Sequence, residues 1–227
     1  RKKVIGFESH IQILNFDSNF SFESVPISEK HDFIPEVKNI PGVKKVQKFA
    51  TKAGIIKTEE EIHGVVLKGV GENYDWSFFQ NNIVDGECFK VNPKNKSNNA
   101  IISKSIADLL SLKTGDEIYT YFIQDPPRIR KFRISGIYDT GLEEFDNIFV
   151  LVDIKHIKKL NDWEDDQISG FEVLIDNFND LDFMANLVYN KVALNFNKNT
   201  SLLKVLSIKE KHPHFFDWIN LFDTNVW

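Results

Sequence analysis

The spacing of hydrophobic and polar residues predicts a strand–helix–strand unit near each end of the chain. In the first unit, residues 10–16 alternate as a strand and a helix follows with Val37 on its apolar face. Strands are then predicted at residues 43–57 and 62–70. Near the other end, residues 171–175 alternate as a strand, Met184 and Val188 share one face of a helix, and residues 202–208 form the next strand.

The middle of the chain has a different pattern. A short helix is predicted after Ser103, a good N-cap residue, with the apolar positions Ile102, Ile106, Leu109 and Leu110 on one face. Gly115 can adopt the left-handed conformation that releases the chain into a strand. Alternating residues at 117–122 and 131–135 predict two strands of a hairpin. A buried-type strand at 148–152 and a helix capped by Asp153 follow.

These elements predict an α+β fold. The two strand–helix–strand units can share one sheet, as in split βαβ folds of the ferredoxin type. Residues 1–88 and 168–210 would then form one discontinuous βαβ subdomain, and residues 89–167 would form a mostly-β subdomain inserted into it.

Composition narrows the class of protein. Of the 227 residues, 42% are hydrophobic and 27% charged, which is typical of a globular protein with a true core. The net charge of -5 disfavours nucleic acid as a partner, because phosphate contacts need a surplus of cations on one face. Cys88 is the only cysteine, which excludes an intramolecular disulfide and a cysteine-based zinc site but leaves the compartment open.

The two ends of the chain allow two interpretations. No run approaches the ~20 apolar residues of a transmembrane helix. However, Arg1, Lys2 and Lys3 open the chain, and phenylalanine and tryptophan residues crowd residues 211–227. Such residues flank bilayers. An ordinary trimmed domain and an extramembrane domain between two spans fit equally well.

Motifs for catalysis, phosphate binding and metal binding give no coherent site. There is no G-x-S-x-G elbow, Walker loop or G-x-G-x-x-G run. His212 and His214 flank a proline without a spaced acidic partner, so surface histidines are expected. Glu143, Glu144 and Asp146 are expected to form an exposed acidic turn. No catalytic residue, cofactor or metal is predicted.

The tip of the predicted hairpin is a candidate binding loop. Two prolines fix its shape and three cations lie within four residues, which suits a preorganised loop for an acidic partner surface. A tight turn with protective charges explains the same composition, and the residues alone favour it. The candidate partner-binding residues are Phe122, Gln124, Asp125, Pro126, Pro127, Arg128, Ile129, Arg130 and Lys131.

Several segments, in order and spacing, resemble a known family. They are residues 4–7 with 10–13, residues 100–116 with their Gly115-Asp116 turn, residues 136–138, and residues 222–225. Together they resemble the extracytoplasmic domain of MacB/LolC/LolE/FtsX-type ABC transporter permeases, most closely the lipoprotein-releasing permease of the Lol system. The likeness covers nearly the whole chain.

The resemblance implies a porter-like subdomain at residues 1–88 and 168–210, a sabre-like subdomain at 89–167, and a segment at 211–227 that leads to a second span. The domain would lie outside the cytoplasmic membrane, in the periplasm. It would couple ATP hydrolysis by a separate cytoplasmic subunit to lipoprotein release and hand-over to a periplasmic carrier. The permease would pair with a second copy or a paralogue, and this domain would hold no cofactor.

The resemblance also places the predicted hairpin where LolC-type permeases carry the hook that recruits the carrier, although the segment here is shorter. MacB-type efflux and FtsX-type regulation of cell-wall hydrolases are the alternatives within the family. A soluble periplasmic hydrolase or metal enzyme is the alternative outside it. That alternative requires a pocket that gathers carboxylates and histidines from distant segments, such as Glu143 and His212.

Overall fold

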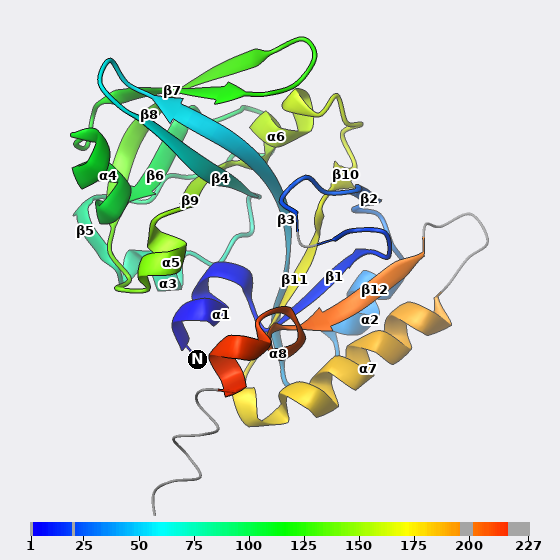
Figure 1. Cartoon of the computed structure of the whole chain (residues 1–227). Coiled ribbons are helices and arrows are strands. Elements are labelled where there is room, and N and C mark those ends of the chain that lie inside the picture. Colours follow the sequence, from blue (N-terminus) through cyan, green and yellow to red (C-terminus); the bar gives the residue numbers. More distant parts are fainter. Residues whose placement is uncertain (1, 20, 196–201, 218–227) are drawn as a thin grey trace, which may run out of the picture.

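The two predicted strand–helix–strand units share one sheet in the computed structural model, which describes residues 2–19, 21–195 and 202–217 (Figure 1). The strand order β12-β1-β11-β3 is that of a ferredoxin-like split βαβ unit, with β11 antiparallel to both β1 and β3. The α+β fold class is therefore confirmed. The elements of this half are β1 (Ile11–Asn15), α2 (Phe33–Lys38), β3 (Val43–Lys57), β11 (Gly170–Ile175), α7 (Leu181–Leu194) and β12 (Leu203–Ser207).

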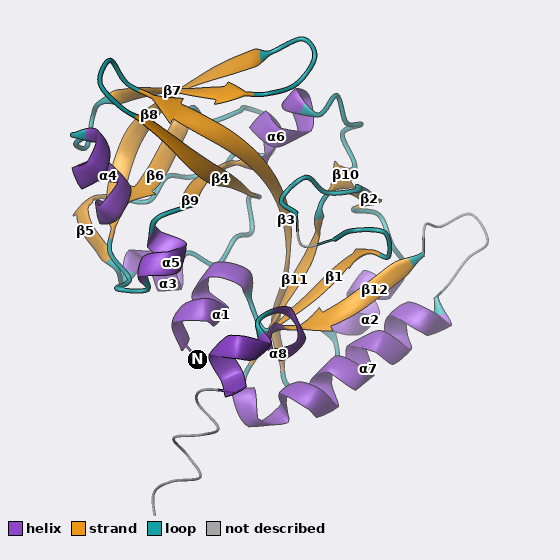
Figure 2. Ribbon diagram, viewed as in Figure 1, coloured by secondary structure: helices purple, strands orange, loops and turns teal. Residues whose placement is uncertain are grey.

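Helices α2 and α7 pack on one face of this sheet and against each other (Figure 2). The apolar stripes predicted for them are the buried faces: Val37 is buried on α2, and Met184 and Val188 are buried on α7. The opposite face of the sheet carries polar side chains, including Gln12, Gln47 and Glu172, and these are buried as well.

A closed ring of strands forms the other half of the molecule. Strand β7 pairs with β8 and also with β3, so the path β3-β4-β9-β6-β8-β7 returns to its start. Gly54 on β3 makes the closure possible, because a Cβ there would lie 2.9 Å from Thr120 and 3.0 Å from Phe122. The additional strands are β4 (Ile62–Val70), β5 (Ile83–Gly86), β6 (Asn99–Ser103), β7 (Glu117–Phe122), β8 (Arg128–Tyr138) and β9 (Phe149–Asp153).

Strand β3 belongs to both halves. Its first residues pair with β11, and from Phe49 onward it pairs with β4. Strand β4 in turn pairs with β9, so a single hydrogen-bonded sheet runs through both halves. The division of the chain at residues 88/89 and 167/168 stays a prediction.

Short elements connect the two halves and cover their ends. Strands β2 and β10 pair as a separate ribbon. The short elements as a group are α1 (Lys2–Glu8), β2 (Ile27–Ser28), α3 (Ser77–Gln80), α4 (Lys104–Leu110), α5 (Glu143–Asp146), α6 (Ile154–Leu160), β10 (Gln167–Ile168), a 3₁₀ helix (Phe178–Asp180) and α8 (Ile208–Lys211).

Local signals in the middle of the chain are mostly confirmed. Ser103 Oγ accepts a hydrogen bond from the amide of Ile106 at 3.0 Å, Asp153 caps α6, and Gly115 has a φ of +93°. The predicted helix face is confirmed at Ile106 and Leu110, which are buried, but not at Ile102 and Leu109. Ile102 lies in β6 and Leu109 is 49% exposed, because the helix begins only after the cap.

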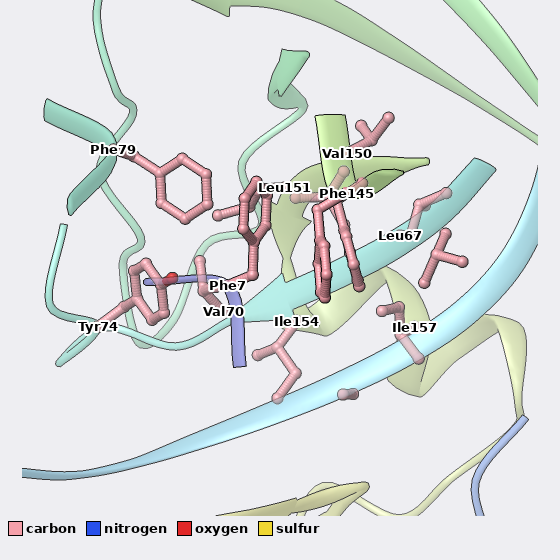
Figure 3. Packing of buried hydrophobic residues seen from close by; sticks show 14 of the residues in the cluster. Phe7, Leu67, Val70, Tyr74, Phe79, Phe145, Val150, Leu151, Ile154 and Ile157 are labelled. Carbon is pink, nitrogen blue, oxygen red and sulfur yellow. The ribbon is translucent and has the colours of Figure 1, made fainter. Parts of the chain in front are cut away.

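An aromatic cluster fills the space between α1 and the end of the ring. The fully buried ring of Phe7 lies at its centre, with Phe79 on one side and Phe145 on the other (Figure 3). The ring centroids lie 5.5 Å and 5.1 Å from that of Phe7. Offset and edge-on contacts between aromatic rings at these distances add stability to that from burying the surface of the rings. Helix α1 is therefore anchored in the core of the closed ring of strands.

Candidate functional site

The predicted hairpin is formed by β7 and β8 and lies at one end of the molecule (Figure 1). Its strands alternate as expected. Ile118, Thr120 and Phe122 point inward, and Tyr119 and Tyr121 are exposed. Phe122 is only 2% exposed, so it anchors the hairpin in the ring and is not available to a partner.

The tip of the hairpin is fastened to the carboxyl end of α6. The Arg128 guanidinium donates to the carbonyl of Lys159 at 2.7 Å and to both carboxylate oxygens of Asp162 at 2.9 and 3.0 Å. The Gln124 amide donates to the carbonyl of Leu160 at 2.9 Å. These donors satisfy carbonyls that a helix end leaves without partners, and a cation is favourable there. Arg128 and Gln124 therefore hold the tip in place within the domain.

The remaining residues of the tip differ in their contacts and in their exposure. Arg130 donates to the carbonyl of Ile129 at 2.9 Å, and Lys131 lies 3.6 Å from Glu117. Asp125, Pro126 and Pro127 are exposed, and the Asp125–Pro126 peptide bond is cis.

The outer face of the hairpin is apolar toward the tip and charged toward its base, where Glu117, Lys131 and Arg133 are exposed. Ile123 is 89% exposed at the tip, and Ile129 is 50% exposed beside its cross-strand neighbour Tyr121. Tyr119 continues this face along β7 at 46% exposure. Exposed apolar side chains that lie next to one another mark interaction surfaces more often than isolated ones do. We call Tyr119, Tyr121, Ile123 and Ile129 the outer hairpin face.

The structure also shows where the other candidate residues from the sequence lie and what they contact. Asp146 is buried, which corrects its expected exposure. Its carboxylate accepts hydrogen bonds from the Thr140 hydroxyl at 2.6 Å and from the Thr140 and Gly141 amides. Burial raises the pKa of Cys88 to about 11. Glu143 begins α5, and His214 is exposed. Within the described ranges, no three histidine, cysteine, aspartate or glutamate side chains are grouped to hold a metal ion.

The described ends of the chain lie side by side at the end of the molecule opposite the hairpin (Figure 1). The Glu8 carboxylate at the end of α1 accepts from His212 and lies 3.1 Å from the Lys211 ammonium of α8. Burial alone would raise the pKa of Glu8, but the His212 hydrogen bond and the Lys211 charge more than offset it, and the pKa is lowered to about 2. Residues 218–227 of the predicted 211–227 segment lie outside the described residues.

A buried ion pair continues inward from this point. Lys68 of β4 and Glu172 of β11 lie 2.8 Å apart with side chains 3% and 1% exposed. Lys68 also donates to the carbonyl of Phe7, and Glu172 accepts from the Gln47 amide at 3.2 Å. The pair thus joins α1, the split βαβ sheet and the ring of strands.

Sequence reasoning missed this network. Its signal was a single charge within an otherwise apolar strand, Lys68 after three apolar residues and Glu172 between Phe171 and Val173. A charge in a strand that is buried on both faces needs a partner. The partner lies 104 positions away and could not be named without the fold.

Across the part of the chain that the structure describes, no helix has the length and apolar character needed to cross a bilayer.

Acid should weaken the fold in two stages. Burial lowers the pKa of His156 to about 4, and burial together with the charge of Lys44 lowers that of His10 to about 4. The unfolded histidines take up protons near pH 6.5, so their contribution is present above that pH and is lost as pH falls toward 4. The contribution of Glu8 is present above about pH 4.5 and is lost as pH falls toward 2.

This prediction is tested by urea unfolding between pH 7 and 4. His156→Gln should flatten the dependence of the unfolding free energy on pH by up to about 3 kcal/mol over this range. His214→Gln, at an exposed position, is the matched control and should leave the slope unchanged. Equal slopes for the wild type and His156→Gln would contradict the assignment of this pH dependence to the lowered pKa of His156.

Comparison with known proteins finds similarity to solved structures, but not to family models or curated sequences. No family model matches the chain, and no curated protein sequence matches it. The extracellular domain of the noncanonic ABC-type transporter YknZ from Gram-positive bacteria is similar, with a TM-score of 0.55, 18% identity, and coverage of 87% of this chain and 99% of that domain. The periplasmic region of MacB from Actinobacillus actinomycetemcomitans gives a TM-score of 0.54, 12% identity, and coverage of 99% and 96%. The chain therefore shares its fold with these two extracytoplasmic domains.

Proposed function

We propose that the chain is the extracytoplasmic domain of an ABC transporter permease and that it transmits movement without catalysing a reaction itself. The observation that carries this proposal is the match of nearly the entire chain to two such domains. The arrangement of the ends supports it, since α1 and α8 are fastened together at one end of the molecule. A domain inserted between two spans needs this arrangement.

The contacts at this end suggest how movement would travel. Phe7 is packed in the aromatic cluster and its carbonyl is bound by Lys68 of β4. A displacement of α1 would therefore act on the ring of strands directly. The hairpin lies at the far end of the same ring (Figure 1). Rigid packed elements carry such displacements because interiors are densely packed. In this proposal ATP is bound by a separate cytoplasmic subunit, and a second permease copy or paralogue completes the transporter.

The finer form of the proposal is release of lipoproteins from the cytoplasmic membrane and their hand-over to a periplasmic carrier. It rests on the sequence resemblance to the Lol-system permease. The outer hairpin face supports a contact role, because Ile123 and Ile129 are exposed while Arg128 and Gln124 are bound to α6. We therefore assign any carrier contact to the apolar outer face and to the exposed residues Asp125, Pro126 and Pro127.

A second candidate is MacB-type efflux. The similarity to the periplasmic region of MacB over 99% of this chain favours it. The two candidates share the coupling role of the domain and differ in what is moved. FtsX-type control of cell-wall hydrolases stays a third possibility within the same fold.

The placement outside the cytoplasm can be tested by labelling intact cells. We expect full-length protein carrying Cys88→Ser and Ile123→Cys to react with a membrane-impermeant maleimide, because residue 123 is 89% exposed. Cys88→Ser with Ile134→Cys is the matched control and should stay unlabelled, since residue 134 is fully buried. Labelling of residue 123 only after cell lysis would contradict the proposal.

The lipoprotein hypothesis predicts the effect of a hairpin variant in the source organism. Depletion of the full-length protein should trap lipoproteins in the cytoplasmic membrane, and Ile123→Asp with Ile129→Asp should restore less than about a tenth of release. Leu109→Asp should restore release fully, because Leu109 on α4 matches Ile129 in exposure but lies off the hairpin. Normal lipoprotein release after depletion would remove this hypothesis and favour the efflux candidate.

A further inference from the structure

A cavity of about 500 Å³ lies beside α6, apart from the outer hairpin face and from the network at the chain ends. Strand β3, helix α6 and the segment before β6 form its walls. Its cations and its largest apolar side chain are Lys48, Lys94, Lys155, Lys158, Lys159 and Trp163, which we call the α6 lysine pocket.

Three of the five lysines are balanced by acids of this chain. Lys48 lies 3.0 Å from Glu29 and 3.3 Å from Glu72. Lys155 lies 3.3 Å from the fully buried Asp153. Lys158 lies 3.9 Å from Glu29 and also donates to the carbonyl of Asp165. The carboxylate of Asp165 is the third acid of the pocket lining, after Glu29 and Glu72.

Lys94 and Lys159 have no acidic side chain within 4 Å among residues 2–19, 21–195 and 202–217. Their neighbourhood is crowded with like charge. Burial, followed by the charges of Lys159 and Arg130, lowers the pKa of Lys96 next to the pocket. Burial lowers the pKa of Lys158 as well, and Lys48 adds repulsion against the attraction of Glu29. Lys94 and Lys159 are both exposed, and the five lysines outnumber the four acids Glu29, Glu72, Asp153 and Asp165. In a protein of net charge -5, this is a local positive surplus that an anion would relieve.

The pocket also has an apolar wall. Ile154, Pro93 and the half-buried Trp163 line it. The backbone amide of Trp163 donates to the carbonyl of Lys158 at 2.9 Å, which holds the tryptophan beside the lysines. Binding pockets combine such a wall with a few placed polar groups. A ligand for this pocket therefore needs both an anionic group and a ring or hydrocarbon part.

We propose that the α6 lysine pocket binds a small molecule that carries a doubly charged anionic group, such as a phosphate monoester, joined to a ring. Lys94 and Lys159 would hold the anionic group, because two ammonium groups without an acidic partner in the described ranges match the double charge of a phosphate monoester near neutral pH. Trp163 would contact the ring. The site does not rest on the proposed permease function: its lining residues include none from the network at the chain ends or from the outer hairpin face, although the carbonyl of Lys159 also binds Arg128 of the hairpin tip.

Calorimetric titration of the 227-residue chain tests the proposal with phenyl phosphate, inorganic phosphate and phenol as probes. We expect phenyl phosphate to bind more tightly than inorganic phosphate, and phenol not to bind. Lys94→Gln with Lys159→Gln should weaken phenyl phosphate binding by at least about tenfold. Lys113→Gln, at an exposed lysine outside the pocket, is the matched control and should leave the affinity unchanged.

Three results would overturn the proposal. They are the absence of saturable binding of either phosphate up to about 10 mM, equal affinity for both phosphates, and binding that survives the double substitution. A further arm uses vesicles of anionic phospholipid. Vesicle binding without phenyl phosphate binding would replace the small-molecule site with a lipid surface. Unchanged melting temperatures of both lysine variants would show that loss of binding is not loss of fold.

Discussion

The buried pair of Lys68 and Glu172 is the interaction on which the arrangement of this domain depends. Each charge lies in a strand of a different half, and neither is accessible to water. A buried charge without its partner is strongly destabilising, so β4 and β11 must both keep their register with β3, which lies between them, for the two charges to be satisfied. Lys68 also binds the carbonyl of Phe7. The same ammonium group therefore fixes how α1 enters the molecule.

From this pair the structure can be followed in two directions. Toward the chain ends, Gln12 links Glu172 to Lys211, and Lys211 and His212 enclose Glu8. Toward the ring, Phe7 enters the aromatic cluster beside β9, and the ring extends to the hairpin that is fastened on α6. The two ends of the molecule are thus connected by one series of packed and hydrogen-bonded elements. A coupling domain requires such continuity, and this supports the proposed role.

Sequence patterns predicted the elements whose stability is local. Strand β3 and strand β4 begin and end where alternation placed them, and the caps at Ser103 and Asp153 form as expected. Contacts between segments far apart in the chain could not be predicted from the sequence. The short helix α1 has no apolar period long enough to predict it, and ring closure depends on the small size of Gly54 opposite Phe122. For the hairpin, composition indicated a basic docking loop, but the fold uses Arg128 for α6 and leaves isoleucine and tyrosine exposed.

Hydrogen exchange at α1 measures the central claim most directly, namely that the Lys68–Glu172 pair fastens α1 to both halves. In Lys68→Met, the amides of residues 5–12 should exchange at least about tenfold faster than in the wild type, while those of α7 should change less. That local loss of protection is the result that the account predicts. Unchanged protection of α1, or an equal acceleration throughout the domain, would contradict it.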